Sequence, residues 1–262
     1  MADIVFTYNG KRVSPSSGKV LGKKALPVLA SRSMRFDFKY DHFDPTTGLI
    51  DHSDEGLIWT HVSGDVYDFH YDNADWGYRT LNIGGKTVAG GLFNVYAYSG
   101  GSSIVYPMSQ HKFDVLDMDL TGVTTVSSLF NSARQVQNIF SIRNTSSVTD
   151  FSGFLNHGRT IAITSIPLFD TSSATNMANM FRECRYLTSI PLFNTGNVTN
   201  VGYMFSGCLA VESGALALYQ QMSTQTTPPT DHKNTFLSCG ANTVTGAAEL
   251  AQIPTSWGGT MA

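Results

Sequence analysis

Apolar residues recur at a fixed spacing along the second half of the chain. Within each of several similar segments they stand at positions i, i+3, i+6 and i+7, as in Val198, Val201, Met204 and Phe205. This spacing predicts one face of a short helix. Just before it, Leu187, Ile190 and Leu192 predict a strand whose apolar side chains point inward, and Thr195 or Asn197 is placed to cap the helix that follows.

The pattern is a repeat with a period of 24 residues. Residues 166–184 and 190–208 are nearly the same sequence, and two weaker copies precede them around Val148 and Val123. A unit of this length does not bury its apolar side alone, so the units are expected to stack and share one core. The sequence therefore predicts a solenoid of strand and helix units.

The first half of the chain has a different pattern. From Met34 to Asp41 apolar and polar residues alternate strictly, which predicts a half-buried strand. Similar runs at 56–62, 66–71 and 78–83 are separated by Gly, Asp and Asn turns. This rhythm is typical of a small antiparallel β-sandwich, which we expect at 34–112.

After Cys208 the period breaks. Residues 212–223 and 246–252 predict short helices, and Trp257 is available to cover the open end of the core. An atypical last unit of this kind is what a cap of a repeat protein requires, so we expect a cap at about 209–262.

The repeat resembles a known family. The run LTSIPLFNTGNVTNVGYMFSGC (residues 187–208) looks like the BspA-like class of bacterial leucine-rich repeats, whose units typically contain N-V-T-N-M-x-x-M-F-x-x-C. The resemblance covers about 120–240 and is most specific across 164–208. Earlier units depart from it, since Ala133 and Gly158 stand where the pattern has Cys. The family is associated with bacterial surface proteins and adhesion, and is also encoded by phages of gut bacteria.

Together these patterns predict an α+β fold in three parts. An extended docking arm at 1–33 is followed by the antiparallel β-sandwich-like domain at 34–112. A leucine-rich-repeat-like β/α solenoid then occupies 113–262 and ends in the C-terminal cap.

Charge is sparse and unevenly placed. The chain has 14% charged residues and a formal net charge of −3, yet residues 1–39 carry eight basic residues against two acids, while 40–78 carry nine acids and no Lys or Arg. The basic stretch lacks the interleaved aromatic residues of a nucleic-acid surface. Neutralisation of the basic stretch by the acidic one, within one chain or across a subunit boundary, is therefore favoured over nucleic-acid binding. The candidate docking residues are Lys11, Arg12, Lys19, Lys23 and Lys24.

The three cysteines occupy one position of successive units. Because the spacing is regular and long, we expect buried, reduced thiols in a structural ladder rather than a metal site. A disulfide between the cysteines of adjacent repeat units is the second interpretation. The ladder residues are Cys184, Cys208, Cys239, Phe181, Phe205 and Phe236.

Motifs for catalysis are weak. The seven histidines are scattered, and neither a Gly-x-Ser-x-Gly string nor a phosphate-binding loop occurs. A Ca²⁺ site among Asp41, Asp44, Asp51 and Asp54 stays open, although a solvated loop is the stronger reading. A glycosidase would need two carboxylates across a cleft, and the sequence singles out no such pair. We expect no enzyme activity, no metal and no cofactor.

The N-terminal residues show neither a secretory signal nor a membrane span, so usual export and membrane insertion are not expected. The resemblance and these features lead to one main hypothesis, a non-enzymatic phage virion protein, as capsid or tail decoration or fibre. Residues 1–33 would contact other virion proteins, as a homo-oligomer or within a large assembly, and the repeats would display an adhesive or assembly surface, with cell-surface polysaccharide as one partner. The alternative is a bacterial cell-surface adhesin that binds glycans or proteins.

Overall fold

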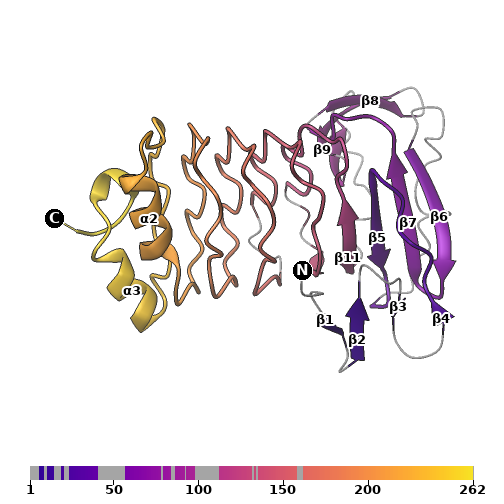
Figure 1. Cartoon of the computed structure of the whole chain (residues 1–262), viewed down its shortest axis with the longest axis horizontal. Coiled ribbons are helices and arrows are strands. Elements are labelled where there is room, and N and C mark those ends of the chain that lie inside the picture. The colour runs from indigo at the N-terminus through magenta and orange to yellow at the C-terminus, as the bar shows by residue number, and fades with distance from the viewer. Residues whose placement is uncertain are drawn as a thin grey trace.

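The computed structural model places strands at one end of the molecule, stacked coils in the middle and two helices at the other end (Figure 1). It describes residues 6–8, 11–14, 19–20, 24–40, 57–77, 79–83, 86–91, 93–97, 112–131, 133, 135–157 and 162–261.

The main sheet has five strands in the order β12-β11-β5-β7-β6. All neighbours are antiparallel except β11 and β12, which are parallel. Its strands are β5 (Ser33–Asp37), β6 (Leu57–Ser63), β7 (Val66–Tyr71), β11 (Phe113–Asp119) and β12 (Val136–Ile139).

Two smaller antiparallel sheets accompany it, one of four strands and one of three. The four-stranded sheet consists of β1 (Phe6–Tyr8), β2 (Lys11–Ser14), β3 (Lys19–Val20) and β4 (Lys24–Ala25), each paired with the next. The three-stranded sheet has the order β10-β9-β8 and consists of β8 (Arg79–Ile83), β9 (Lys86–Gly91) and β10 (Asn94–Ala97).

Strand β5 lies inside the main sheet and is buried on both faces. Met34 and Phe36 are fully buried, and the Phe36 ring lies 5.2 Å from that of Phe93 and 5.6 Å from that of Phe113. On the other face Arg35 and the rest of the odd-numbered residues are polar and also buried. The alternation predicted the strand correctly, but the expectation that it is half-buried is wrong, because its polar face is covered too.

The predicted fold class is wrong in two respects. In place of the predicted antiparallel sandwich, the main sheet is mixed, and in it β5 pairs with β11 from beyond residue 112. The chain is also mostly sheet and turns rather than α+β, since the described residues form only two α-helices, α2 (Ala215–Thr224) and α3 (Val244–Leu250). These two lie close to the helices predicted at 212–223 and 246–252.

The repeat region consists of coils joined to one another by backbone hydrogen bonds. Alternate N–H groups donate to the next coil, as from Val201 to the Asp231 carbonyl (2.8 Å) and from Phe205 to the Thr235 carbonyl (2.9 Å). The intervening groups close tight turns within the coil, as from Met204 N–H to the Val201 carbonyl (3.1 Å). Both sets satisfy backbone groups that would otherwise be buried without a partner.

The predicted leucine-rich-repeat-like β/α solenoid is therefore wrong. No described residue between 120 and 211 is helical. Apart from β12, backbone pairing between the coils consists of isolated parallel bridges rather than strands. Left-handed residues interrupt any helix at fixed positions, as at Asn179 (φ 56°) and Glu183 (φ 62°). The apolar spacing of three residues comes from consecutive turns, which also leaves no helix for Thr195 or Asn197 to cap.

The prediction that all three apolar side chains of the strand point inward is also wrong for one of them. Leu192 is 53% exposed, whereas Leu187, Ile190 and the next residue, Phe193, are buried. A turn in which Phe193 N–H donates to the Pro191 carbonyl (3.0 Å) sends Leu192 outward and the phenylalanine into the core.

The left-handed positions offer a direct test of this backbone. Ser238 has φ 59°, and the equivalent position one coil earlier is Gly207. Replacing Ser238 by glycine should raise the free energy of unfolding by about 0.5–1 kcal/mol, because relief of the left-handed strain exceeds the added entropy of the unfolded chain. Ser206→Gly is the matched control: Ser206 is not left-handed, so urea denaturation should show a loss. Equal changes of one sign in both variants would contradict the assignment.

The core is continuous from the sheet to the C-terminal end. It runs from Met34 through Phe130 and Phe205 to Trp257 without a break at residue 112. Sheet and coils thus share one apolar interior, and the two domain boundaries expected from the sequence stay a prediction.

The stack of coils ends at helix α2, where a side chain makes the hydrogen bonds that the backbone of a further coil would make. Inside the stack the buried Thr171 hydroxyl donates to the Asn194 carbonyl of the next coil (2.8 Å). At the last such position Thr195 donates instead to the side-chain oxygen of Gln225, the residue after α2 (3.1 Å). Trp257, in the 3₁₀ turn η3 (Thr255–Trp257), is 6% exposed and stacks on His232 at 4.2 Å, as expected of a residue that covers the core.

Candidate functional site

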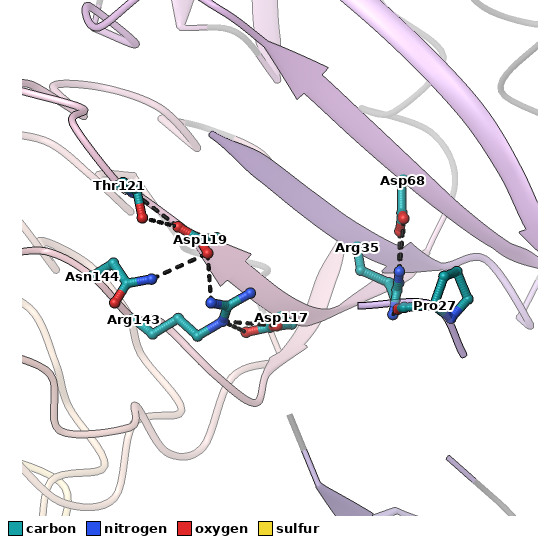
Figure 2. Close-up of polar contacts among 8 residues, drawn as sticks. All are labelled: Pro27, Arg35, Asp68, Asp117, Asp119, Thr121, Arg143 and Asn144. Carbon is teal, nitrogen blue, oxygen red and sulfur yellow. Dashed lines mark hydrogen bonds and ion pairs between the residues drawn. The ribbon is translucent and has the colours of Figure 1, made fainter. Parts of the chain in front are cut away.

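A network of charged side chains joins the sheet to the first coils (Figure 2). The Arg143 guanidinium lies between two buried carboxylates of β11, with its Nε 3.0 Å from Asp117 Oδ2 and its Nη1 2.5 Å from Asp119 Oδ2. Asp119 also accepts hydrogen bonds from Asn144 Nδ2 (3.1 Å) and from Thr121 N–H (2.9 Å) and Oγ1 (2.6 Å). One cation thus holds two strand carboxylates and fixes the coil against the sheet.

A second pair lies on the same sheet. Arg35 of β5 donates two hydrogen bonds to Asp68 of β7, from Nε to Oδ1 (2.6 Å) and from Nη2 to Oδ2 (2.7 Å) (Figure 2). Its Nη1 donates to the Pro27 carbonyl (2.9 Å). In the strand register Arg35 also lies opposite Asp117. The bidentate geometry is the strong form of such a pair, and it ties the segment before β5 to the sheet.

Burial and charge oppose one another at Asp117. Burial raises the pKa of its carboxyl, while the Arg143 guanidinium acts in the opposite direction. A carboxyl whose pKa is raised in the folded state prefers its proton there, so ionised Asp117 depends on Arg143.

The outer surface of the coils carries a column of threonines. Thr124, Thr149, Thr175, Thr199 and Thr230 are exposed at equivalent positions of successive coils. Each hydroxyl from Thr149 onward donates to the carbonyl of the preceding threonine at 3.1–3.3 Å, and Thr124 donates to Ala74. The hydroxyl orientations are therefore fixed, and the lone pairs that remain can accept hydrogen bonds from a partner. We call these five residues the threonine column.

A second exposed position on the coils repeats this chemistry elsewhere. The Thr188 hydroxyl donates to the Thr164 carbonyl (3.0 Å), and both residues are exposed. Nearby positions of the same two units carry Leu168 and Leu192, which are 61% and 53% exposed. This surface is mixed, whereas the threonine column is uniformly hydroxylic.

One arrangement resembles a hydrolytic triad. Ser33 Oγ lies 2.9 Å from His70 Nδ1, and His70 Nε2 lies 3.2 Å from Asp72 Oδ1. Ser33, however, is only 2% exposed and its hydroxyl is also 3.2 Å from the Ser31 carbonyl. A nucleophile must reach its substrate, so this chain of contacts acts as cross-strand pairing of β5 with β7.

The structure brings the predicted ladder residues together. All three cysteines are buried and free, and the rings of Phe181, Phe205 and Phe236 stack at 5.3 and 6.2 Å. Burial raises the pKa of the Cys184 thiol to about 12 and that of the other two well above the ordinary value. Since the thiolate is the reactive form, these thiols are not placed for nucleophilic chemistry.

Other predicted residues are placed less fully. Lys11 and Arg12 lie in β2, Lys19 in β3 and Lys24 in β4, with their side chains undescribed. Lys23, and the possible Ca²⁺ ligands Asp41, Asp44, Asp51 and Asp54, lie outside the described residues. Among the residues that are described, no group of three His, Cys, Asp or Glu side chains is arranged to hold a metal ion.

Sequence reasoning missed the buried charges of β11. Its sequence, Phe-Asp-Val-Leu-Asp-Met-Asp, places three acids in a strand that is buried at every position. Acids inside an otherwise apolar run are a signal for paired, buried carboxylates. Their partners could not be read in this way, because Arg143 follows Asp117 by 26 residues.

Comparison with known proteins gives one family match. Residues 102–217, less than half of the chain, are similar to the family DUF285, described as Mycoplasma protein of unknown function. No curated protein and no solved structure matches the chain. In the part of the chain that the structure describes, no helix has the length and apolar character needed to cross a membrane.

Proposed function

We propose that the protein is a non-enzymatic structural component of a phage virion, and that it displays the threonine column to a cell-surface polysaccharide. The observation that carries this proposal is the column itself. It offers five exposed hydroxyls in fixed orientation on coils that are bonded to one another.

The chemistry of the column suits a neutral, hydroxyl-rich ligand. Each threonine presents acceptor lone pairs beside a methyl group, and no charge lies within the column, so binding would consist of many weak hydrogen bonds along a polymer. Because the hydroxyls are already oriented, little side-chain entropy is lost on binding.

The proposal that the protein belongs to a phage virion rests on its sequence. The resemblance of the repeats to BspA-like proteins of gut bacteria and their phages supports a role at a surface, and the basic residues of 1–33 support docking on other virion proteins within a large assembly. A bacterial cell-surface adhesin that binds glycans or proteins is the second candidate, and the same column of exposed hydroxyls supports it.

The test is binding of the purified chain to capsular polysaccharide of the host. The triple variant Thr149→Val, Thr175→Val and Thr199→Val keeps the shape of the column but removes three hydroxyls. If each hydroxyl contributes about 0.5–1 kcal/mol, affinity should fall by roughly tenfold or more.

Thr164→Val with Thr188→Val is the matched control, since it removes the same type of group and bond away from the column. Equal binding by both variants and the unchanged protein would contradict the role of the column. The setting is tested separately: mass spectrometry of purified phage particles should find the chain in many copies, and its absence from particles would favour the adhesin.

A further inference from the structure

A lysine and an aspartate meet where the end of β5 lies beside β11. Lys39 Nζ contacts Asp114 Oδ2, although the two residues are 75 positions apart in the chain. The Asp114 side chain is fully buried and that of Lys39 is 24% exposed. An amine is thus held against a carboxyl group that is removed from water.

The two oxygens of Asp114 have different surroundings. Oδ1 accepts a hydrogen bond from Asn138 Nδ2 (2.7 Å) and lies 3.2 Å from the Tyr40 hydroxyl, which is 3.4 Å from Oδ2. Burial and the Asp114 carboxylate raise the pKa of the Tyr40 phenol above its ordinary value, so it stays a donor. Oδ1 is therefore placed where two donors stabilise negative charge, while Oδ2 faces the amine.

A second carboxyl group lies next to the pair. Asp37 is directly opposite Asp114 in the strand register and is only 7% exposed. Its Oδ1 accepts the backbone N–H of Lys39 (3.0 Å), and its charge acts on Tyr40 as that of Asp114 does. Asp37 is thus a direct neighbour of Asp114 in the sheet and is bonded to the backbone of Lys39.

We propose that Lys39 and Asp114 condense to an intramolecular isopeptide bond. A proton first passes from the Lys39 ammonium group to the Asp114 carboxylate, which leaves a neutral amine and a carboxylic acid. The amine nitrogen then forms a bond to Cγ of Asp114, and the negative charge that develops on Oδ1 is held by Asn138 and Tyr40.

Bond breaking completes the balance. The nitrogen gives up a proton, through Asp37, to the hydroxyl formed by Oδ2, the Cγ–Oδ2 bond breaks, and one water molecule leaves. The products are an amide and water, formed from one ammonium group and one carboxylate, so no oxidant, reductant or activating co-reactant is required.

The protein supplies a condition that free amines and acids in water lack. Fixed neighbours react as if at effective concentrations of about 10⁵ M or more when their geometry is right. The contact between Lys39 Nζ and the fully buried Asp114 side chain provides such a fixed pair.

The bond would close a covalent loop that contains residues 40–113 and would fasten β5 to β11 permanently. It would hold the sheet under force or proteolysis, which suits a display protein but does not depend on the function proposed above.

The experiment is the intact mass of the full-length chain, measured under denaturing conditions. We expect a mass lower than that of the sequence by one water molecule, and a tryptic peptide pair that links Lys39 to Asp114 with no cleavage after Lys39. Lys39→Arg keeps the ion pair but cannot condense, so it should have its full sequence mass.

Asp37→Asn tests the relay, and a smaller fraction of linked chains at a given time after synthesis is expected. A wild-type mass equal to that of the sequence overturns the proposal. A loss of water that persists in the Lys39→Arg variant also overturns it, because the loss would then come from another residue.

Discussion

Replacing Arg143 by methionine should lower the free energy of unfolding by about 3–5 kcal/mol near neutral pH. Methionine fills much of the same volume but leaves the carboxylates of Asp117 and Asp119 buried, 6% and 4% exposed, without their cation. The loss is therefore one of charge compensation rather than of packing. Urea denaturation of both proteins measures it.

This loss should shrink as the pH falls. Burial already raises the pKa of Asp117 in the folded protein, and removal of the guanidinium raises it further. Below that raised pKa the folded state takes up a proton that the unfolded state does not bind until near its ordinary value, so acid stabilises the variant relative to wild type. The difference between the two proteins should be largest near neutral pH and smallest in acid.

Two further variants separate charge from packing. Arg182→Met is the matched control, because Arg182 lies over the Tyr203 ring and bonds Asn179 rather than a pair of carboxylates. A change under about 1 kcal/mol is expected there. Adding Asp117→Asn and Asp119→Asn to Arg143→Met should recover part of the loss. A pH-independent loss with no recovery would contradict the charge argument.

Replacing Phe205 by alanine should lower the free energy of unfolding by about 3–5 kcal/mol, because it opens a cavity in the middle of three stacked phenylalanine rings. Phe205 is fully buried, and its ring stacks between Phe181 at 5.3 Å and Phe236 at 6.2 Å with interplanar angles of 19° and 6°. The Phe205 ring contacts a ring of the coil on each side, so both ring contacts are lost together.

Thermal and urea denaturation measure this effect. Tyr186→Ala is the control, since Tyr186 is 54% exposed and its loss should change stability by about 0.5 kcal/mol or less. A similarly small change for Phe205→Ala would show that the stability of the coils does not depend on the stacked phenylalanine rings.

The sequence predicted which side chains of the repeat lie inside better than it predicted the backbone. The spacing of Val198, Val201 and Met204 correctly identified buried positions. Helices and consecutive three-residue turns both repeat an apolar position after three residues, so the pattern could not separate them. Left-handed backbone at Tyr203, a residue that rarely adopts it, decided the outcome and has no clear signal in the sequence.

The sheet shows the same division. The strands predicted at 66–71 and 78–83 follow from alternation and turn residues, and strands are present there as β7 (Val66–Tyr71) and β8 (Arg79–Ile83). Which strands pair is a long-range property: β11 completes the sheet beside β5 and brings Asp114 to Lys39 and Asp117 to Arg143. No local sequence pattern predicts which distant residues lie side by side, so the charged network could not be predicted from the sequence.

The amide of Gln225 also bears on association between molecules. Its oxygen and nitrogen occupy the Thr195 hydroxyl and carbonyl, which are groups that one more coil would need for its first hydrogen bonds. An unsatisfied edge invites a second copy to add on and, if the contact does not close, to grow into a fibre. At this position the hydroxyl and carbonyl of Thr195 are already bonded within the molecule, so self-association through them is disfavoured.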